Sequence, residues 1–329
     1  MLLIVSNKID LATDFLVLRL TERGIPFLRV NTEDFLLKWE ANLFLESDRL
    51  EVYIQNEGGV CVLVDDLSGA YIRQPILPTL HTAESDKRFI NMEIGETLRS
   101  LWRSIKDDIW LNAPHNILRA SNKPEQLCVA KQLGFIVPKT CVTADINLAR
   151  KFYCQNGKDI IAKAVKHGFL YDNDTAKVAG TQLIDEQNLN RLNDYAHVPM
   201  IFQERIKKRY DLRVTVVGDK VFATAIYSQD YKETALDWRL SSHYKISLKH
   251  KAIDLPTHVQ DLCRRITKKF QLRYSAIDLI LAENGEYFFL ELNPNGQWAW
   301  IEQMVGYPVR DAIINELNSG VEGSYYDVN

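Results

Sequence analysis

The chain has 329 residues, of which 46% are hydrophobic and 25% are charged, a composition typical of an ordinary globular protein with about two domains. Lysine and arginine number 40 against 43 aspartates and glutamates, so the net charge of −3 provides no basic surface for nucleic acid or anionic lipid. No run approaches the roughly 20 apolar residues that a membrane helix needs. We therefore expect neither a nucleic-acid partner nor a membrane partner.

The cysteines and the first residues indicate the compartment. The five cysteines are scattered and form no CxxC pair, which disfavours a disulfide framework or a zinc ribbon. Residues 1–7 have the pattern of an opening β-strand and lack the charged start and cleavage site of a signal peptide. We expect a cytoplasmic protein, and its composition favours an enzyme.

The first third of the chain alternates short strands with helices. The predicted elements are strands at 2–5 and 27–30, a helix at 11–23, short strands between 43 and 64, a strand at 70–73 and a helix at 83–106. Gly24 ends the first helix, and Pro26 follows it. This alternation predicts a small α/β unit that closes near Pro114.

A second segment opens with a helix start. Ser121 or Asn122 caps this helix, Pro124 lies in its first turn, and Gly134 ends it. Further strands are predicted at 160–163, 200–203, 212–217, 220–227 and 275–293, with helices at 187–192, 257–270 and 309–317. Strands that cluster apart from the helices indicate an α+β, largely antiparallel architecture.

The segment from Tyr274 to Asn293 is the most informative part of the sequence. Asn284-Gly285 is typical of a two-residue type I′ turn, and this turn places Asp278 directly opposite Glu291. Period-2 alternation then puts Asn293 on the same face as the two acids. The other face is apolar throughout and is assigned to the core; it comprises Ile277, Leu279, Leu281, Phe288, Leu290 and Leu292.

Two carboxylates directly opposite each other across a hairpin have Cβ atoms about 5 Å apart and repel each other. A positive group between Asp278 and Glu291 is therefore expected, and Asn293 adds a neutral oxygen. Oxygen ligands without His or Cys suit a hard cation, Mg²⁺ or Mn²⁺. The alternative is a solvated face whose acids pair with lysines or arginines. The third oxygen ligand and the Pro294-Asn295-Gly296 turn favour the metal.

Ser275-Ala276-Ile277-Asp278 followed by Glu291-Leu292-Asn293-Pro294-Asn295-Gly296 resembles the metal-binding hairpin of the ATP-grasp ligases. The resemblance extends from about Pro114 to the end of the chain, and it implies ATP and Mg²⁺ or Mn²⁺ as cofactors. It implies an ATP-grasp fold of mixed α+β and α/β character, in which an N-terminal pre-ATP-grasp α/β domain precedes two subdomains. The implied boundaries are 1–114 for the first domain, 115–200 for the N-terminal (small) subdomain and 201–329 for the C-terminal subdomain with the metal hairpin.

The resemblance also implies phosphate contacts. Lys123, at a helix start, and Lys163, at the end of an apolar strand, match the two lysines that ATP-grasp enzymes place on the α- and β-phosphates. The alternative for each is an ordinary surface lysine. The polar stretch 166–180, with Gly168 and Gly180 near its ends, matches the segment that covers the phosphates in the family, although its composition alone predicts only a mobile loop.

The segment 200–206 resembles the hinge strand that receives adenine. Gln203, Glu204, Arg205 and Ile206 are the implied contacts, with the Glu204 carboxylate accepting from the exocyclic amine. Asp211 matches the acidic residue that binds the ribose hydroxyls.

Two arginines complete the implied site. In the family, arginines corresponding to Arg213 and Arg239 face the transferred phosphate and the substrate carboxylate, and a planar donor fork suits both groups. Both are therefore implied as catalytic. The alternative for each is a surface salt bridge.

Two further motifs narrow the family. The run from Asn293 to Glu302 is similar to that of the ligases that cyclise ribosomally made peptides, the microviridin or graspetide type. Ala70-Tyr71-Ile72-Arg73-Gln74-Pro75 resembles their N-terminal Trp/Tyr-Arg-Arg-Pro motif, with Gln74 in place of the second arginine. Trp298 and Trp300 are expected to be packing residues.

The resemblance implies an ADP-forming ligase that activates Asp or Glu side chains of a precursor peptide as acyl phosphates. The activated groups are then joined to Ser/Thr hydroxyls or Lys amines. One alternative is a carboxylate–amine ligase acting on a small molecule or a protein tail, and another is a nucleotide-binding regulatory protein without turnover. The precursor peptide is the expected partner, and a homodimer is left open.

Overall fold

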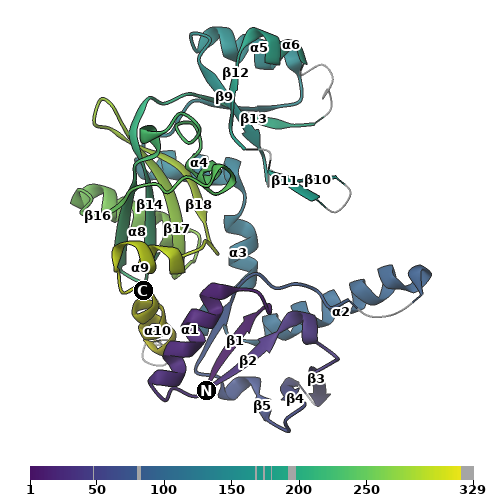
Figure 1. Ribbon diagram of the computed structural model, residues 1–329. Coiled ribbons are helices and arrows are strands. Elements are labelled where there is room, and N and C mark those ends of the chain that lie inside the picture. Colours follow the sequence, from purple (N-terminus) through teal and green to yellow (C-terminus); the bar gives the residue numbers. More distant parts are fainter. Residues whose placement is uncertain are drawn as a thin grey trace.

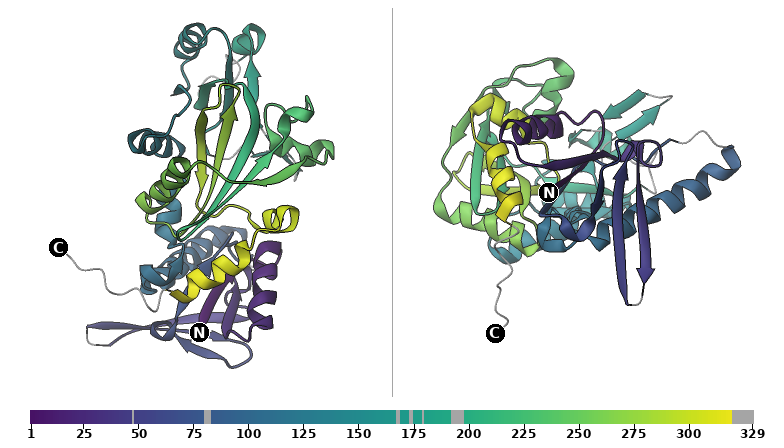
Figure 2. Two further views of the ribbon diagram at one scale, coloured as in Figure 1. Left: turned by 90° about the vertical axis from the view of Figure 1, so that its left-hand side faces the viewer. Right: turned by 90° about the horizontal axis from the view of Figure 1, so that it is seen from below.

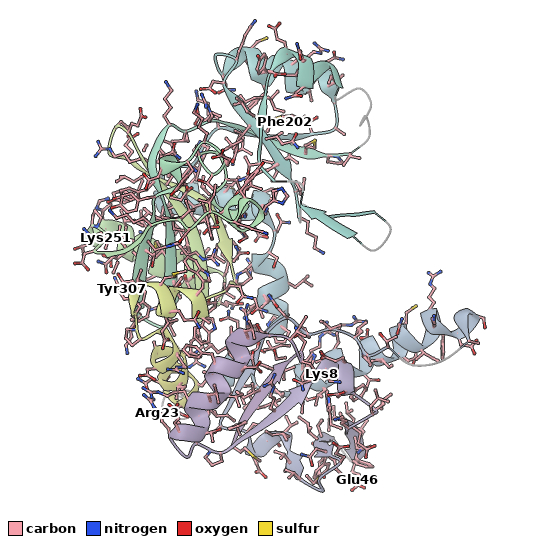
Figure 3. The ribbon with its side chains drawn as sticks, viewed as in Figure 1. Lys8, Arg23, Glu46, Phe202, Lys251 and Tyr307 are labelled. Carbon is pink, nitrogen blue, oxygen red and sulfur yellow. The ribbon has the colours of Figure 1, made fainter. Side chains whose placement is uncertain are left out.

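The computed structural model describes residues 1–46, 48–79, 83–166, 169–172, 175–178, 180–191 and 198–319. It contains an N-terminal α/β unit, a five-stranded sheet (the large sheet) and a four-stranded sheet (the small sheet), stacked from bottom to top in Figure 1. Phe202 lies in the small sheet at one end of the molecule, and Glu46 lies at the other end (Figure 3). No helix within these ranges combines the length and the apolar character needed to span a bilayer.

The N-terminal unit is the α/β alternation that the sequence predicts. Its four-stranded sheet has the order β2-β1-β6-β7 with all strands parallel, and α1 and α2 belong to this unit (Figure 1). An antiparallel sheet of β3, β4 and β5 forms a hairpin that projects from the unit (Figure 2). The elements are β1 (Leu2–Ser6), α1 (Leu11–Glu22), β2 (Phe27–Asn31), β3 (Trp39–Glu46), β4 (Arg49–Asn56), β5 (Cys61–Leu63), β6 (Gly69–Ile72), α2 (Glu84–Ser104) and β7 (Trp110–Leu111).

Two helices lead out of this unit, α3 (Pro114–Ala120) and α4 (Lys123–Leu133). The predicted cap of α4 is confirmed, because the Asn122 side chain accepts from the Glu125 N–H. Gly134 ends the helix in the left-handed conformation with φ +106°. The position of Lys123 in the first turn of α4 is thereby fixed.

The small sheet is antiparallel, with the order β12-β9-β13-β8. One face packs on α5, whose Asp145 cap the sequence analysis overlooked, and on α6. Ile160, Ala162 and Phe202 belong to this core, so the alternate residues of the strands, Ile161 and Lys163, face the other way. The elements are β8 (Thr140–Thr143), α5 (Ile146–Gln155), β9 (Ile160–Ala164), β12 (Gln182–Ile184), α6 (Glu186–Arg191) and β13 (Met200–Glu204).

The stretch 166–180, predicted as a loop, contains two strands. β10 (Phe169–Asp172) and β11 (Thr175–Val178) pair antiparallel. Gly168 and Leu192, which the sequence analysis placed at the ends of a loop and a helix, lie outside the described residues.

The large sheet is antiparallel, with the order β16-β15-β14-β17-β18. α4 and α8 cover one face, and the end of the sheet nearest the N-terminal unit packs on α9, α10 and α1. Trp298 is fully buried in this second core, which confirms its expected packing role. The elements are β14 (Lys208–Val217), β15 (Lys220–Ile226), α7 (Ser241–Tyr244), β16 (His250–Ile253), α8 (Thr257–Lys269), β17 (Tyr274–Ala282), β18 (Tyr287–Asn293), α9 (Ala299–Val305) and α10 (Val309–Ser319).

The β17–β18 hairpin has the predicted pairing at its open end but not the predicted turn. The Ala282 N–H donates to the Glu286 carbonyl, so the loop has three residues, 283–285, rather than two. The extra loop residue shifts the pairing by one, and a bulge at Leu290 restores it, so that Asp278 faces Glu291.

This shift corrects the predicted faces of β18. Phe289, which pairs with Leu279, is fully buried in the core, whereas Phe288 and Leu290 are only partly buried. The assignment of Phe288 and Leu290 to the core face was therefore wrong. Leu290 instead lines a cavity beside the acids.

Helix α10 packs closely on the N-terminal sheet, and Gly69 permits this contact. A Cβ at Gly69 would lie 2.6 Å from the Leu317 carbonyl oxygen and 2.7 Å from Leu2 Cδ2. We expect Gly69→Ala to lower the free energy of unfolding by about 1–3 kcal/mol, because the helix has to move away. Urea denaturation of the whole chain measures this change.

Gly95→Ala in α2 is the matched control. A Cβ there meets only the end of the flexible Arg99 side chain, at 3.6 Å. Alanine favours a helix over glycine by about 1 kcal/mol, so this variant should be as stable as the parent or more so. Equal destabilisation by both substitutions would contradict the packing argument.

Candidate active site

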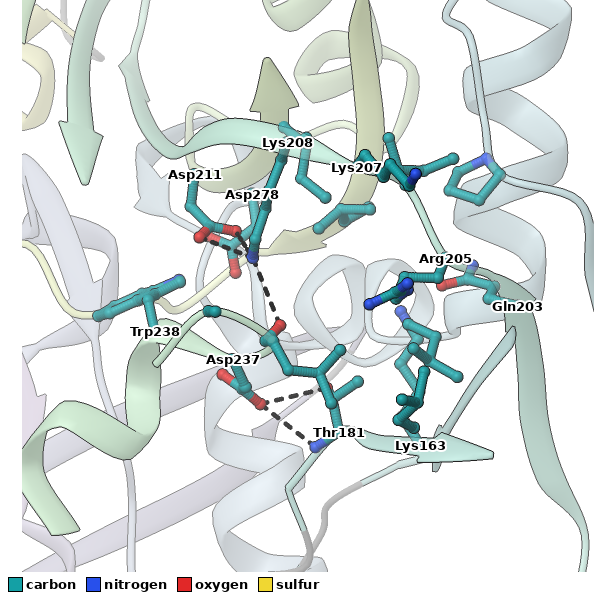
Figure 4. A pocket seen from close by; sticks show the side chains of 18 of the residues that line it. Lys163, Thr181, Gln203, Arg205, Lys207, Lys208, Asp211, Asp237, Trp238 and Asp278 are labelled. Atoms are coloured by element: carbon teal, nitrogen blue, oxygen red, sulfur yellow. Dashed lines mark hydrogen bonds and ion pairs between the residues drawn. The ribbon is translucent and has the colours of Figure 1, made fainter. Parts of the chain in front are cut away.

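Two connected cavities lie where the small sheet faces the large sheet. The first, of about 320 Å³, is lined by the hinge segment around Gln203 and by Asp211 and Asp278 (Figure 4). The second, of about 1140 Å³, extends toward the N-terminal unit and is lined by Lys123 and Asn293 among others. Their shared wall contains Lys163, Thr181, Asp237, Arg239 and Glu291.

A row of charged side chains crosses three adjacent strands at this junction. Arg213 on β14 is opposite Asp278 on β17, and Asp278 is opposite Glu291 on β18. Both carboxylates are only 7% exposed. The predicted facing of the two acids is therefore confirmed, and Arg213 Nη1 donates to Asp278 Oδ1 at 2.8 Å.

Glu291 is held by two cations from other parts of the chain. Lys123 Nζ lies 3.1 Å from Glu291 Oε2, and Arg239 Nη1 lies 3.1 Å from Oε1. Gln126 positions Lys123, because its side chain donates to the Leu292 carbonyl and accepts from the Leu292 N–H, which ties α4 to β18.

Arg239 is oriented by an acid that the sequence analysis did not select. Its Nε and Nη2 donate to the two oxygens of Asp237 at 2.9 and 3.1 Å. Asp237 also accepts from the backbone N–H and the hydroxyl of Thr181 (Figure 4). The sequence signal for Asp237 was its position two residues before Arg239.

Burial and charge act differently on the two facing carboxyl groups. Burial raises the pKa of Asp278, the Glu291 charge adds to this effect, and Arg213 opposes it. Burial also disfavours ionised Glu291, but Lys123, Arg239 and Lys163 outweigh it and hold the pKa of Glu291 well below its usual range. Burial lowers the pKa of Lys163 to about 8.

The structure brings the expected metal ligands Asp278, Glu291 and Asn293 together, and lysine and arginine side chains form ion pairs with the two acids. Lys123, Arg213 and Arg239 pair with Asp278 and Glu291, as the alternative of an acid pair neutralised by lysine and arginine requires. Asn293 lies on β18 opposite Ala276 and lines the second cavity. No group of three or more His, Cys, Asp or Glu side chains suited to a metal occurs among the described residues.

The donors that are present nevertheless fit a magnesium–nucleotide pair. Two carboxylates and an amide are hard oxygen donors. Next to the two facing acids, four cations (Lys123, Lys163, Arg213 and Arg239) stand against three carboxylates (Asp237, Asp278 and Glu291), so these seven groups carry one net positive charge. A metal ion alone would be repelled by this excess, whereas a polyphosphate that brings its own metal is attracted.

The hinge segment lines the first cavity but is partly engaged in its own contacts. The Glu204 carboxylate accepts from the Lys139 N–H at 2.8 Å, and Arg205 forms an ion pair with Asp159 at 2.6 Å. Ile206 lines the cavity as well. The buried Gln203 Oε1 has no hydrogen-bond partner within the described part of the chain, so it can accept from a ligand N–H.

Asp211 is also engaged. Lys208 Nζ lies 2.8 Å from its carboxylate (Figure 4), and the Ser228 hydroxyl donates to it at 2.5 Å. Burial raises the pKa of Asp211. Lys208, three residues before Asp211 on the same strand, was not selected from the sequence although both side chains line the first cavity.

A family model described as the RimK-like ATP-grasp domain matches residues 176–317. None of the curated protein sequences compared with the chain gives a significant match.

Several solved structures are similar over nearly the whole chain. The RiPP-associated ATP-grasp ligase of Chryseobacterium gregarium, solved with ADP and a leader and core peptide, is 26% identical with a TM-score of 0.88, over 96% of both chains. Macrocyclase MdnC of Microcystis aeruginosa MRC, bound with precursor peptide MdnA, is 24% identical with a TM-score of 0.83, over 96% of this chain and 98% of MdnC. The ATP-grasp ligase PsnB, complexed with minimal precursor, Mg and ADP, is 22% identical with a TM-score of 0.71, over 96% of this chain and 97% of PsnB.

The predicted resemblance to the ATP-grasp ligases is thereby confirmed: the chain has the ATP-grasp fold, and its residues 176–317 match the RimK-like ATP-grasp domain.

Proposed function

We propose that this protein is an ATP-dependent, ADP-forming ligase that acts on a ribosomal precursor peptide. Asp or Glu side chains of the peptide are activated as acyl phosphates and joined to Ser/Thr hydroxyls or Lys amines. The observation that carries the proposal is the junction of the two cavities, where four cations surround the facing acids Asp278 and Glu291. This arrangement suits a polyphosphate and a metal on one side and an anionic acceptor on the other.

The similar solved structures support the same function. The Chryseobacterium gregarium ligase holds ADP together with a leader and a core peptide, and PsnB holds Mg, ADP and a minimal precursor. We infer that ATP and Mg²⁺ are the cofactors here, with Mn²⁺ as an alternative metal, and that a precursor peptide is the partner. The cytoplasmic location, a homodimer and the division at 114 and 200 remain predictions.

The residues are assigned as follows. Lys123 and Lys163 bind the phosphates, and Gln203 with the segment 204–206 receives the adenine, where the unpartnered Gln203 Oε1 accepts from its amine. Asp211 binds the ribose hydroxyls once Lys208 releases part of its carboxylate. Asp278, Glu291 and Asn293 would hold Mg²⁺, which when bound neutralises phosphate charge.

The reaction follows from positioning and charge neutralisation. A carboxylate oxygen of the peptide attacks the γ-phosphorus of ATP, the bond from that phosphorus to the bridging oxygen breaks, and ADP leaves. Arg213 and Arg239 stabilise the negative charge on the transferred group through planar donor forks. A hydroxyl or amine of the peptide then attacks the acyl carbon, phosphate leaves, and the nucleophile loses its proton to solvent or phosphate.

The size of the second cavity favours a peptide over a small molecule. Its volume of about 1140 Å³ is more than three times that of the first cavity, which is about 320 Å³. A carboxylate–amine ligase for a small molecule has no use for so large an acceptor cavity, although the ATP chemistry would be the same. This alternative therefore ranks second.

The function is tested with the purified protein, ATP, Mg²⁺ and a synthetic peptide encoded by a short reading frame next to the gene, rich in Asp/Glu and in Ser, Thr or Lys. ADP should form only with the peptide, and the product should lose the mass of one water for each bond. A control peptide with Asn and Gln in place of every Asp and Glu should give no ADP. ADP formation with free amino acids alone would support the small-molecule alternative, and no ADP in any mixture would contradict the ligase proposal.

Lys163 gives a pH-dependent prediction. Its ammonium is charged below a pKa of about 8, so affinity for ADP should be highest at lower pH and fall as the pH rises through that value. Lys163→Arg should show no such fall over this pH range, because a guanidinium stays charged. Lys163→Met should weaken binding about tenfold or more at neutral pH. Isothermal titration calorimetry across the pH range measures these affinities.

The matched control for this prediction is Lys151→Met. Lys151 is exposed on α5, which covers the other face of the small sheet. Its substitution should leave both the affinity and the pH profile unchanged. A wild-type profile in Lys163→Arg, or a normal affinity in Lys163→Met, would remove Lys163 from the phosphate site.

Asp278→Asn tests the metal site. The substitution keeps the shape but removes one of the two facing charges, so Mg²⁺ should no longer strengthen ADP binding, while ADP binding without Mg²⁺ should persist. Stability should decrease, because Arg213 loses the carboxylate that neutralises it. Calorimetric titrations with and without Mg²⁺ separate the two effects. Asp261→Asn, at an exposed ion pair on α8, should change neither.

A further inference from the structure

Arg73 belongs to a sequence motif to which the proposed chemistry assigns no role. It follows β6 in the N-terminal unit, yet its side chain is completely buried. Its Nε lies 2.9 Å from the Asp10 carboxylate, which is also buried. Its Nη1 extends toward the segment that follows the hairpin of β17 and β18, while its buried Nη2 has no hydrogen-bond partner among the described residues.

Arg73 Nη1 donates to two successive backbone carbonyls of that segment. The distances are 3.0 Å to the Asn295 oxygen and 2.8 Å to the Gly296 oxygen. Two more side chains hold the same turn: Asn112 donates to the Pro294 carbonyl at 2.8 Å, and the Tyr274 hydroxyl donates to the Gly296 carbonyl at 2.7 Å. Three consecutive carbonyls are thus held by donors distant in sequence.

The turn that these donors hold, residues 294–297, contacts Arg213 directly. The Gln297 carbonyl accepts from Arg213 Nη2 at 3.4 Å. A Cβ at Gly296 would lie 2.5 Å from the same Nη2, so the turn backbone forms the wall against which the Arg213 guanidinium rests. The turn also begins directly after Asn293. A displacement of residues 294–297 would therefore move Arg213 and Asn293 together.

We propose that Arg73, with its partner Asp10, is a positioning residue for phosphoryl transfer, which acts by fixing the turn 294–297 behind Arg213 and Asn293. The inference rests on the proposed ligase function, but the contacts by which Arg73 holds the turn do not depend on that function. Arginine is required because one guanidinium serves a carboxylate and two carbonyls in a fixed geometry, whereas a lysine ammonium on a flexible stem cannot. The N-terminal unit thereby helps to position the residues assigned to phosphoryl transfer without contacting the nucleotide itself.

Arg73→Lys tests the proposal while keeping a positive charge beside Asp10. We expect ADP affinity and the KM for ATP to stay within about twofold, because neither Arg73 nor the turn 294–297 lines the first cavity, to which the nucleoside is assigned. The kcat for peptide-dependent ADP formation should fall about 10- to 100-fold, as small displacements of reacting groups have such effects. Backbone amides of residues 295–298, which follow Pro294, should exchange hydrogen at least about tenfold faster.

A second variant tests the same contacts in case Arg73→Lys does not fold. Asp10→Asn combined with Arg73→Met removes both charges and both carbonyl contacts, so it leaves no buried unpaired charge, and it should show the same loss of kcat. Arg19→Lys is the matched control, since Arg19 on α1 pairs with Asp311 on α10 and joins the same parts of the molecule away from the turn. It should keep kcat and the exchange rates of 295–298.

The possible outcomes distinguish the positioning role of Arg73 from the proposed ligase activity. Wild-type kcat and exchange in Arg73→Lys, or an equal loss of kcat in Arg19→Lys, would overturn the positioning role. If the unmodified protein fails to turn over ATP with any peptide, the proposed function fails, yet the exchange rates of 295–298 still decide whether Arg73 fixes the turn.

Discussion

Two buried carboxylates that face each other across β17 and β18 are the constraint on which the site depends. Asp278 and Glu291 cannot both be ionised at this depth without nearby cations. The cations come from separate segments: Arg213 from the neighbouring strand, Lys123 from the start of α4, and Arg239 from the loop before α7. The acid pair therefore determines how three distant segments meet, and each of them brings a donor suited to phosphate.

The same charges explain how the protein is stable without ligand and still suited to bind one. In the protein alone, lysine and arginine neutralise the acids. If Mg²⁺ and ATP bind as we propose, the metal takes over this role at the carboxylates, and the cations become available to the phosphates. Charge neutralisation is then conserved through an exchange of partners, and Lys163, whose pKa is lowered to about 8 by burial, gains its counter-charge from the nucleotide.

Local signals in the sequence predicted much of the fold, and long-range contacts limited the rest. The Asn122 cap and the Gly134 stop follow from neighbouring residues. The pairing of Asp278 with Glu291 was predicted correctly because a bulge compensates for the wrong turn. The turn type was wrong because an Asn-Gly pair also fits a three-residue loop, and the bulge that compensates for it leaves no pattern in the sequence. Asp237 and Arg73 could not be assigned because their partners, Thr181 and the 294–297 turn, come close only in the folded chain.

The two cavities are lined by different residues and share one wall. Gln203, Lys208 and Asp211 line only the first cavity, whereas Asn293 and Lys123 line only the second, so under the proposed function the nucleoside and the peptide occupy different cavities. Under the same proposal, the γ-phosphate and the attacking carboxylate meet at the shared wall, where Lys163, Arg239 and Glu291 lie. Arg239 is fixed there by Asp237, and Asp237 in turn accepts from Thr181, which directly precedes β12 of the small sheet. We infer that Asp237 helps to position the small sheet, which carries the hinge segment and Lys163, next to Arg239.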